Sequence, residues 1–152
     1  MVAVLVYLYD NYGALNACPE PDTLSQRLHA AGFEHDEVAA ALLWLQGLAR
    51  VTHDSVQMRP AQASTFRVFA DFEVARLGQR AVRFLLFLES AGQLDAVQRE
   101  IVIERALAID ESPLALATLK VVVLMVLWSQ QADINVLLLE ELLGDGEAHL
   151  LH

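Results

Sequence analysis

Residues 35–48, HDEVAAALLWLQGL, determine the expected fold of this chain, because they form its clearest amphipathic helix. Val38, Ala41 and Leu45 fall on one stripe at helical spacing, and Gly47 is expected to end the helix. This helix is the third in order along the chain. The third helix is where a winged-helix domain places its recognition helix, so the stretch predicts that arrangement.

The same stretch lacks the charge that a helix reading nucleic acid needs. It contains no Lys or Arg, and it presents Asp36 and Glu37 in its first turn. Neutralised phosphates supply most of a small domain's affinity for nucleic acid. We therefore expect the natural ligand to be another polypeptide, with nucleic acid disfavoured.

Two helices are expected before residue 35. Apolar residues recur at helical spacing from Val2 to Tyr12 and predict the first. Asp22 or Thr23 is expected to cap the second, and Gly32 is a natural stop for it.

A β-hairpin is expected after the third helix. The helical period disappears between residues 49 and 70, where two short β-prone runs, ARVT (49–52) and TFRVFA (65–70), flank a polar segment with Pro60. Three helices followed by a hairpin predict a winged-helix-like amino-terminal half, residues 1–70.

Residues 71–152 predict a helical subdomain packed on the first, so the expected fold class is mainly α. Asp95 with Gln98 three residues later has the spacing of a capping box. Ser112 followed by Pro113 is expected to open an apolar central helix. The helices expected here are 72–77, 81–90, 95–109, 113–128 and 133–143.

Charge is unevenly distributed in this acidic chain of net charge −10. Residues 50–83 hold six Arg and three acidic residues, a net of +3, whereas the remaining 118 residues hold four basic and seventeen acidic ones, a net of −13. An acidic surface repels nucleic acid and anionic lipid, while the arginine zone, residues 50–83, can engage an acidic partner.

Sequence features predict a cytoplasmic protein without a membrane anchor. The lone Cys18 cannot form an internal disulfide, and the apolar amino terminus lacks the positive charge of a signal peptide. The apolar run from Leu114 to Trp128 contains Lys120 and is shorter than the roughly 20 residues that a bilayer requires. We expect a central helix buried by its neighbours.

Several residues have a possible catalytic role and a more ordinary alternative. Lys120, the only lysine, could be an activated amine, but an ammonium paired with a carboxylate is the commoner outcome. Cys18 lies in an acidic, proline-containing segment that would not activate a thiol. No nucleophile elbow, phosphate-binding loop or metalloprotease motif is present, so no catalytic residue and no cofactor are expected.

Two groups have the spacing of metal ligands without completing a site. Glu100 and Glu104 lie one helical turn apart beside two arginines, which favours a salt-bridged surface. His149 and His152 share a helical face but lack further ligands. No metal site is expected, and a metal-dependent enzyme is the weakest alternative.

Six segments carry a family resemblance: VLVYLYDNY, AGFEHDEVAAALLWLQGL, FLLFLESAGQLD, REIVIER, LKVVVLMVL and the terminal LLH. In this order they resemble the bacterial Smg family over nearly the whole chain. The resemblance brings no catalytic residues. It implies a small cytosolic bacterial protein, often encoded beside a DNA-processing protein that loads single strands for recombination.

These observations predict a non-catalytic adaptor or regulator that binds another protein, in a context of bacterial DNA metabolism. Candidate contacts are Trp44, which lies off the main stripe of its helix, and three arginines, Arg50, Arg59 and Arg67. The alternative is a nucleic-acid-binding winged-helix protein that uses an arginine wing. The identity of the partner and a homodimer are left open.

Overall fold

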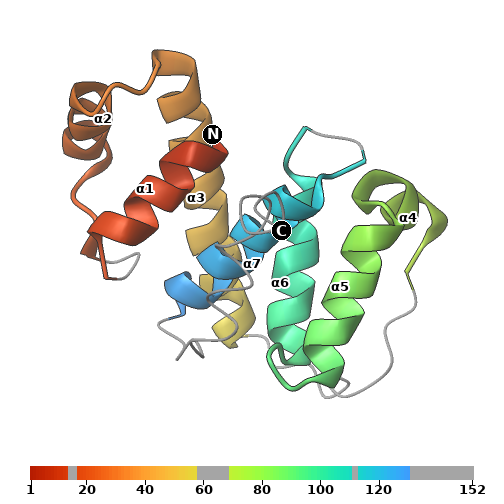
Figure 1. Ribbon diagram of the computed structural model, residues 1–152. Helices are drawn as coiled ribbons and strands as arrows, with labels where there is room; N and C mark the ends of the chain where they lie inside the picture. The colour runs from red at the N-terminus through yellow and green to blue at the C-terminus, as the bar shows by residue number, and fades with distance from the viewer. Residues whose placement is uncertain (14–16, 58–68, 111–112, 131–152) are drawn as a thin grey trace, which may run out of the picture.

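The computed structural model describes residues 1–13, 17–57, 69–110 and 113–130 (Figure 1). The helices in these ranges are α1 (Val2–Asn11), α2 (Pro21–Ala30), α3 (His35–Gln57), α4 (Asp71–Leu77), α5 (Gln79–Ser90), α6 (Ala96–Leu107) and α7 (Leu116–Ser129). The described ranges contain no β-strand. The mainly helical fold class is thereby confirmed.

α7 is the central helix, as its uniformly apolar sequence predicts. It packs against α1, α3, α5 and α6, and every residue from Thr118 to Trp128 is buried. One hydrophobic core joins residues of both predicted halves around it. The boundary at residue 70 falls just before α4, and the division into halves 1–70 and 71–152 stays a prediction.

The start of α7 differs from the sequence-based expectation. Pro113 and Leu114 lie before the helix, whose N-cap is Ala115. The Leu114 amide donates a hydrogen bond to the Arg76 carbonyl oxygen at 2.9 Å. This bond ties the preceding segment to α4, so helical geometry begins three residues after the expected Pro113.

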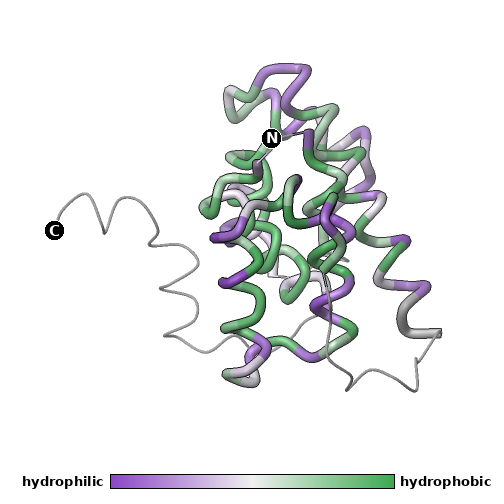
Figure 2. The backbone as a smooth tube through the Cα atoms, turned by 90° about the vertical axis from the view of Figure 1, so that its right-hand side faces the viewer, coloured by the Kyte–Doolittle hydropathy of each residue, from purple (hydrophilic) through white to green (hydrophobic). Residues whose placement is uncertain are grey.

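The outer helices are amphipathic, and hydrophobic and hydrophilic residues alternate along them (Figure 2). In α5, Ala81, Leu85 and Leu88 face the core, while the remaining surface is half-buried or exposed. Among the described residues, no helix has the length and apolarity needed to cross a membrane.

α3 is longer than expected, because it continues through Gly47 to Gln57. Leu48 is fully buried and Val51 packs against the core, so the apolar stripe keeps its helical spacing beyond the glycine. The expectation that Gly47 ends the helix is therefore wrong. Tertiary packing overrides the cost of a glycine inside a helix, which is about 1 kcal/mol.

The winged-helix hairpin is not supported. Its first expected strand, residues 49–52, is part of α3. Its second, residues 65–70, lies mostly outside the described residues, and the described Phe69 and Ala70 are not in a strand. The β-branched side chains of Val51 and Thr52 favour strands only weakly, and their place on the buried side of α3 decides their conformation.

Two helix starts show which capping signals hold. At α6, the Asp95 carboxylate accepts from the Gln98 amide at 2.7 Å, and the Gln98 side chain accepts from the Asp95 amide at 3.0 Å. The predicted capping box is confirmed. α2 begins earlier than expected, with Glu20 as N-cap and Pro21 at the first helical position, because proline pre-sets helical φ there.

Candidate functional site

A groove is lined by residues of α3, by Met1 and by residues at the carboxyl-terminal end of α6 and just after it. Its volume is about 410 Å³. Its lining residues are Met1, Ala40, Leu43, Trp44, Gln46, Gly47, Arg50, Arg105, Ala108, Ile109 and Asp110. We call this the α3–α6 groove.

The floor of the groove is fixed by two reciprocal hydrogen bonds between α3 and α6. Trp44 Nε1 donates to the Arg105 carbonyl oxygen at 3.0 Å, and Arg105 Nη1 donates to the Trp44 carbonyl oxygen at 2.9 Å. The guanidinium carbon of Arg105 also lies 5.6 Å from the centre of the Trp44 ring, in cation–π range. Each residue thus satisfies the buried polar group of the other.

The charge of Arg105 is compensated locally. Although Arg105 is only 5% exposed, its Nε and Nη2 donate to the two carboxylate oxygens of Glu104 at 2.6 and 2.9 Å. A buried arginine with a bidentate carboxylate partner is held in one geometry. The groove therefore has a preformed floor.

Gly47 leaves the space that the Arg105 guanidinium occupies. A Cβ atom on Gly47 would lie 2.7 Å from Cζ and 2.8 Å from Nη2 of Arg105, and closer still to Nη1. No side chain larger than hydrogen fits without displacing the guanidinium. This close approach explains why a glycine lies in the middle of α3.

The rim of the groove is apolar with one charge of each sign. Leu43, on the side of α3 opposite the core, is 71% exposed. Arg50 and Asp110 are the exposed charged residues of the lining. Most of the described lining residues are apolar, so the arrangement is suited to holding apolar side chains.

The sequence-predicted contacts fall in two groups. Trp44 and Arg50 both line the α3–α6 groove, although Trp44 is only 4% exposed and presents little surface to a partner. Arg59 and Arg67 lie outside the described residues. Sequence reasoning missed Leu43 because it selected Trp44 as the apolar residue outside the buried stripe of α3. Leu43 lies opposite that stripe, which makes its position the better indication of a contact surface.

The remaining arginines of the arginine zone differ in role. Arg76 in α4 donates from Nη2 to the carbonyl oxygens of Leu107 and Ile109, at 3.0 and 3.1 Å. It therefore satisfies carbonyls at the end of α6, where a cation is favourable. Arg80 and Arg83 in α5 are exposed.

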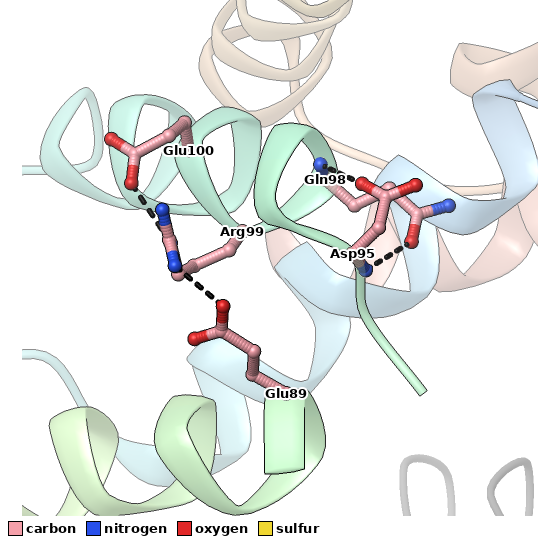
Figure 3. Close-up of polar contacts among 5 residues, drawn as sticks. All are labelled: Glu89, Asp95, Gln98, Arg99 and Glu100. Atoms are coloured by element: carbon pink, nitrogen blue, oxygen red, sulfur yellow. Dashed lines mark hydrogen bonds and ion pairs between the residues drawn. The ribbon is translucent and has the colours of Figure 1, made fainter. Parts of the chain in front are cut away.

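The carboxylate pair of α6 belongs to ion pairs, as expected. Glu104 pairs with Arg105, and Arg99 Nε donates to Glu100 at 2.9 Å (Figure 3). Arg99 also reaches across to α5, where its Nη1 donates to Glu89 at 2.5 Å. Arg99 and Arg105 are buried, whereas Glu100 and Glu104 are exposed. Of these pairs, Arg99–Glu89 joins two helices, and the other two lie within α6.

Lys120, Cys18 and the histidines of α2 and α3 lie in different surroundings. Lys120 is 2% exposed, with its ammonium 5.3 Å from the centre of the Phe84 ring. Burial raises the pKa of the half-buried Cys18 thiol, which lowers its reactivity. His29 and His35 stack with ring centres 5.6 Å apart.

Within the described ranges, no three or more His, Cys, Asp or Glu side chains are grouped so that they could hold a metal ion. His149 and His152 lie outside these ranges.

Comparison with known proteins identifies the family. The family model described as "Protein of unknown function (DUF494)" matches residues 1–152. The chain belongs to the DUF494 family. Among curated DUF494-like relatives, "Protein Smg homolog" of Bordetella avium is 53% identical and that of Bordetella petrii 51%, each over 100% of both chains. The homolog of Methylibium petroleiphilum is 46% identical over the same extent.

These relatives confirm the predicted Smg resemblance and the bacterial character of the family. No solved structure matches the chain.

Proposed function

We propose that this protein is a non-catalytic adaptor or regulator that binds another polypeptide, and that the α3–α6 groove receives apolar side chains of that partner. The observation that carries the proposal is Leu43, a large aliphatic side chain 71% exposed on the rim of a preformed groove. The family's implied genomic context suggests that the partner acts in bacterial DNA metabolism.

The size and chemistry of the groove support this proposal. Its volume of about 410 Å³ accommodates a few side chains and falls within the roughly 300–1,000 Å³ of typical binding pockets. A single exposed leucine is common on any protein, but here Leu43 adjoins Met1, Ala40 and Ile109 in one concave surface. Covering an exposed leucine contributes about 1.5–3 kcal/mol, which a partner's apolar side chain would gain.

The fixed floor of the groove favours a partner that binds without rearranging α3 and α6. The Trp44–Arg105 hydrogen bonds hold α3 and α6 together independently of any ligand. A preorganised site spends less binding free energy on ordering its own side chains. The exposed charges of Arg50 and Asp110 would orient the incoming segment.

A filled groove tests the proposal. Ala40→Trp places a large ring in the groove, whereas Ala39→Trp places the same ring on an exposed neighbouring position that does not line it. Leu43→Glu removes the apolar rim. Affinity capture from the bacterium that encodes the chain, with nuclease treatment, would compare the three variants with the native protein.

We expect the native chain and Ala39→Trp to capture a protein partner even after nuclease treatment. Ala40→Trp and Leu43→Glu should lose that partner. Equal capture by Ala40→Trp and the native chain would refute the groove as the site. Capture that disappears on nuclease treatment would refute a polypeptide ligand. If the partner is a second copy, sedimentation equilibrium will show a dimer that Ala40→Trp dissociates.

A further inference from the structure

The solvent-facing side of α5 combines two arginines with two large apolar residues. Arg80 and Arg83 are exposed, and Leu86 and Phe87 are 40% and 60% exposed. Gln79 and Ser90 complete this side, opposite the buried positions that contact the core. We call it the outer face of α5; the helix itself is separated from α3 by α6 (Figure 1).

No acidic residue lies on the outer face of α5. The one carboxylate of the helix, Glu89, is half-buried and paired with Arg99 (Figure 3). Among the described residues, neither Arg80 nor Arg83 has a hydrogen-bond or ion-pair partner. An uncompensated pair of cations is unusual in a chain with twenty acidic and ten basic residues.

The other arginines near these helices have roles within the fold. Arg76 satisfies the carbonyls at the end of α6, Arg99 joins α6 to α5, and Arg105 joins α6 to α3. Arg80 and Arg83 form no such contact. Within the part of the chain that the structure describes, their charges therefore take no part in a hydrogen bond or ion pair of the fold, and they remain available to a ligand.

The spacing along α5 defines the ligand. With a rise of 1.5 Å per residue, Arg80 and Arg83 are about 4.5 Å apart along the axis, and Phe87 follows about 6 Å further on. Positions i, i+3 and i+7 share one side of a helix. A matching segment carries two carboxylates about one helical turn apart, followed by an apolar side chain.

We propose that the outer face of α5 binds an acidic segment of a partner protein, with its carboxylates on Arg80 and Arg83 and an apolar side chain on Leu86 and Phe87. Guanidinium groups bind carboxylates through two parallel hydrogen bonds, which gives orientation as well as affinity. Aromatic and arginine side chains are also the residue types enriched at the centres of protein interfaces. This surface is separate from the α3–α6 groove.

Charge distinguishes this partner from nucleic acid and membrane. Affinity for nucleic acid grows with the number of phosphates that Lys and Arg neutralise, whereas this face supplies two arginines and the chain has a net charge of −10. Each basic residue near an anionic membrane contributes about 1 kcal/mol, so two are too few to hold an acidic protein there. A short acidic peptide segment needs only the two cations present.

Photocrosslinking tests the proposal. p-Benzoylphenylalanine would replace Phe87 in the full-length chain, within the bacterium that encodes it, and the crosslinked segments would be identified by mass spectrometry. The same label would replace Leu43 in a second version. The double variant Arg80→Glu/Arg83→Glu reverses the charge of the outer face of α5, and Arg27→Glu on α2 reverses an exposed charge outside both surfaces.

We expect crosslinks at position 87 to acidic segments with an apolar residue nearby. Arg80→Glu/Arg83→Glu should lower their yield at least tenfold, whereas Arg27→Glu leaves it unchanged. Replacing the carboxylates of the crosslinked segment by lysine should restore crosslinking to Arg80→Glu/Arg83→Glu. Thermal unfolding of both charge variants near that of the native chain would show that these exposed substitutions preserve the fold.

Several results would overturn the proposal. Crosslinks to neutral or basic segments, or no crosslinks at all, would contradict an acidic ligand. Crosslinks that charge reversal leaves unaffected would exclude a role for the arginines. Crosslinks only to residues 131–152 of this chain would exclude a separate partner. Sedimentation of the chain with phosphatidylglycerol vesicles, lost in Arg80→Glu/Arg83→Glu, would assign the face to a membrane instead. Crosslinks at position 43 report on the α3–α6 groove separately, so the two proposals fail independently.

Discussion

Gly47→Ala should destabilise the protein, although the same change in an ordinary helix interior stabilises it by about 1 kcal/mol. The added methyl group would lie 2.7 Å from Cζ of Arg105. The guanidinium must move, which breaks its hydrogen bond to the Trp44 carbonyl oxygen. Overpacking costs about 1–3 kcal/mol, and losing a hydrogen bond from a charged donor costs a further 1.5–3 or so.

The net effect, after the gain in helix propensity, is a loss of roughly 2–5 kcal/mol in the free energy of unfolding. Urea denaturation followed by circular dichroism measures it directly. A midpoint of thermal unfolding lowered by roughly 5 °C or more is expected in a chain of this size. Gly13→Ala is the control, because nothing lies within 4 Å of the added methyl group there.

A double-mutant cycle identifies the cause. In an Arg105→Leu background the guanidinium is absent, so Gly47→Ala should be neutral or stabilising by up to about 1 kcal/mol. Equal destabilisation in both backgrounds would show that Arg105 is not what Gly47 accommodates. A Gly47→Ala protein as stable as the native one would refute the reasoning altogether.

Three further predictions concern single side chains. Asp95→Ala removes the N-cap of α6 and should lower the free energy of unfolding by about 1 kcal/mol in urea denaturation; an unchanged midpoint would contradict the capping box. Arg76→Met leaves carbonyls at the end of α6 without their donor and should lower the free energy of unfolding by about 1–3 kcal/mol. Hydrogen exchange followed by mass spectrometry should show faster exchange at that end of the helix. The control Arg80→Met should leave both quantities unchanged. Burial raises the pKa of the Cys18 thiol, so less thiolate is present at a given pH. Its alkylation by iodoacetamide should therefore reach half its maximal rate at a higher pH in the folded chain than in the urea-unfolded chain. Coincident pH profiles of the two states would refute the effect of burial.

The parts of the fold that follow local rules could be predicted from the sequence. The Asp95–Gln98 capping box depends on residues three apart, and the burial of α7 depends on its own apolar residues. Both were predicted correctly. The start of α2 was placed too late because Pro21 was assigned to the loop rather than to the first helical position.

The parts that depend on distant residues could not be predicted. Gly47 looks like a stop signal until Arg105, 58 residues later, is known to occupy the space beside it. That misassignment ended α3 early, and the β-prone run ARVT (49–52) beyond it was then predicted as a strand of the hairpin. The α3–α6 groove has the same origin, since its second wall comes from the end of α6. The sequence signals for it all lie on α3: Trp44, Arg50 and the apolar Leu43 opposite the buried stripe.

The position of α7 also bears on synthesis. The faces of α1, α3, α5 and α6 that pack on it are made first, and α7 ends only at residue 129. At about 5–20 residues per second, the ribosome takes at least roughly 6 s to reach that point. Until α7 emerges, the nascent chain exposes the apolar surfaces that this helix will cover, and such exposed surfaces promote aggregation.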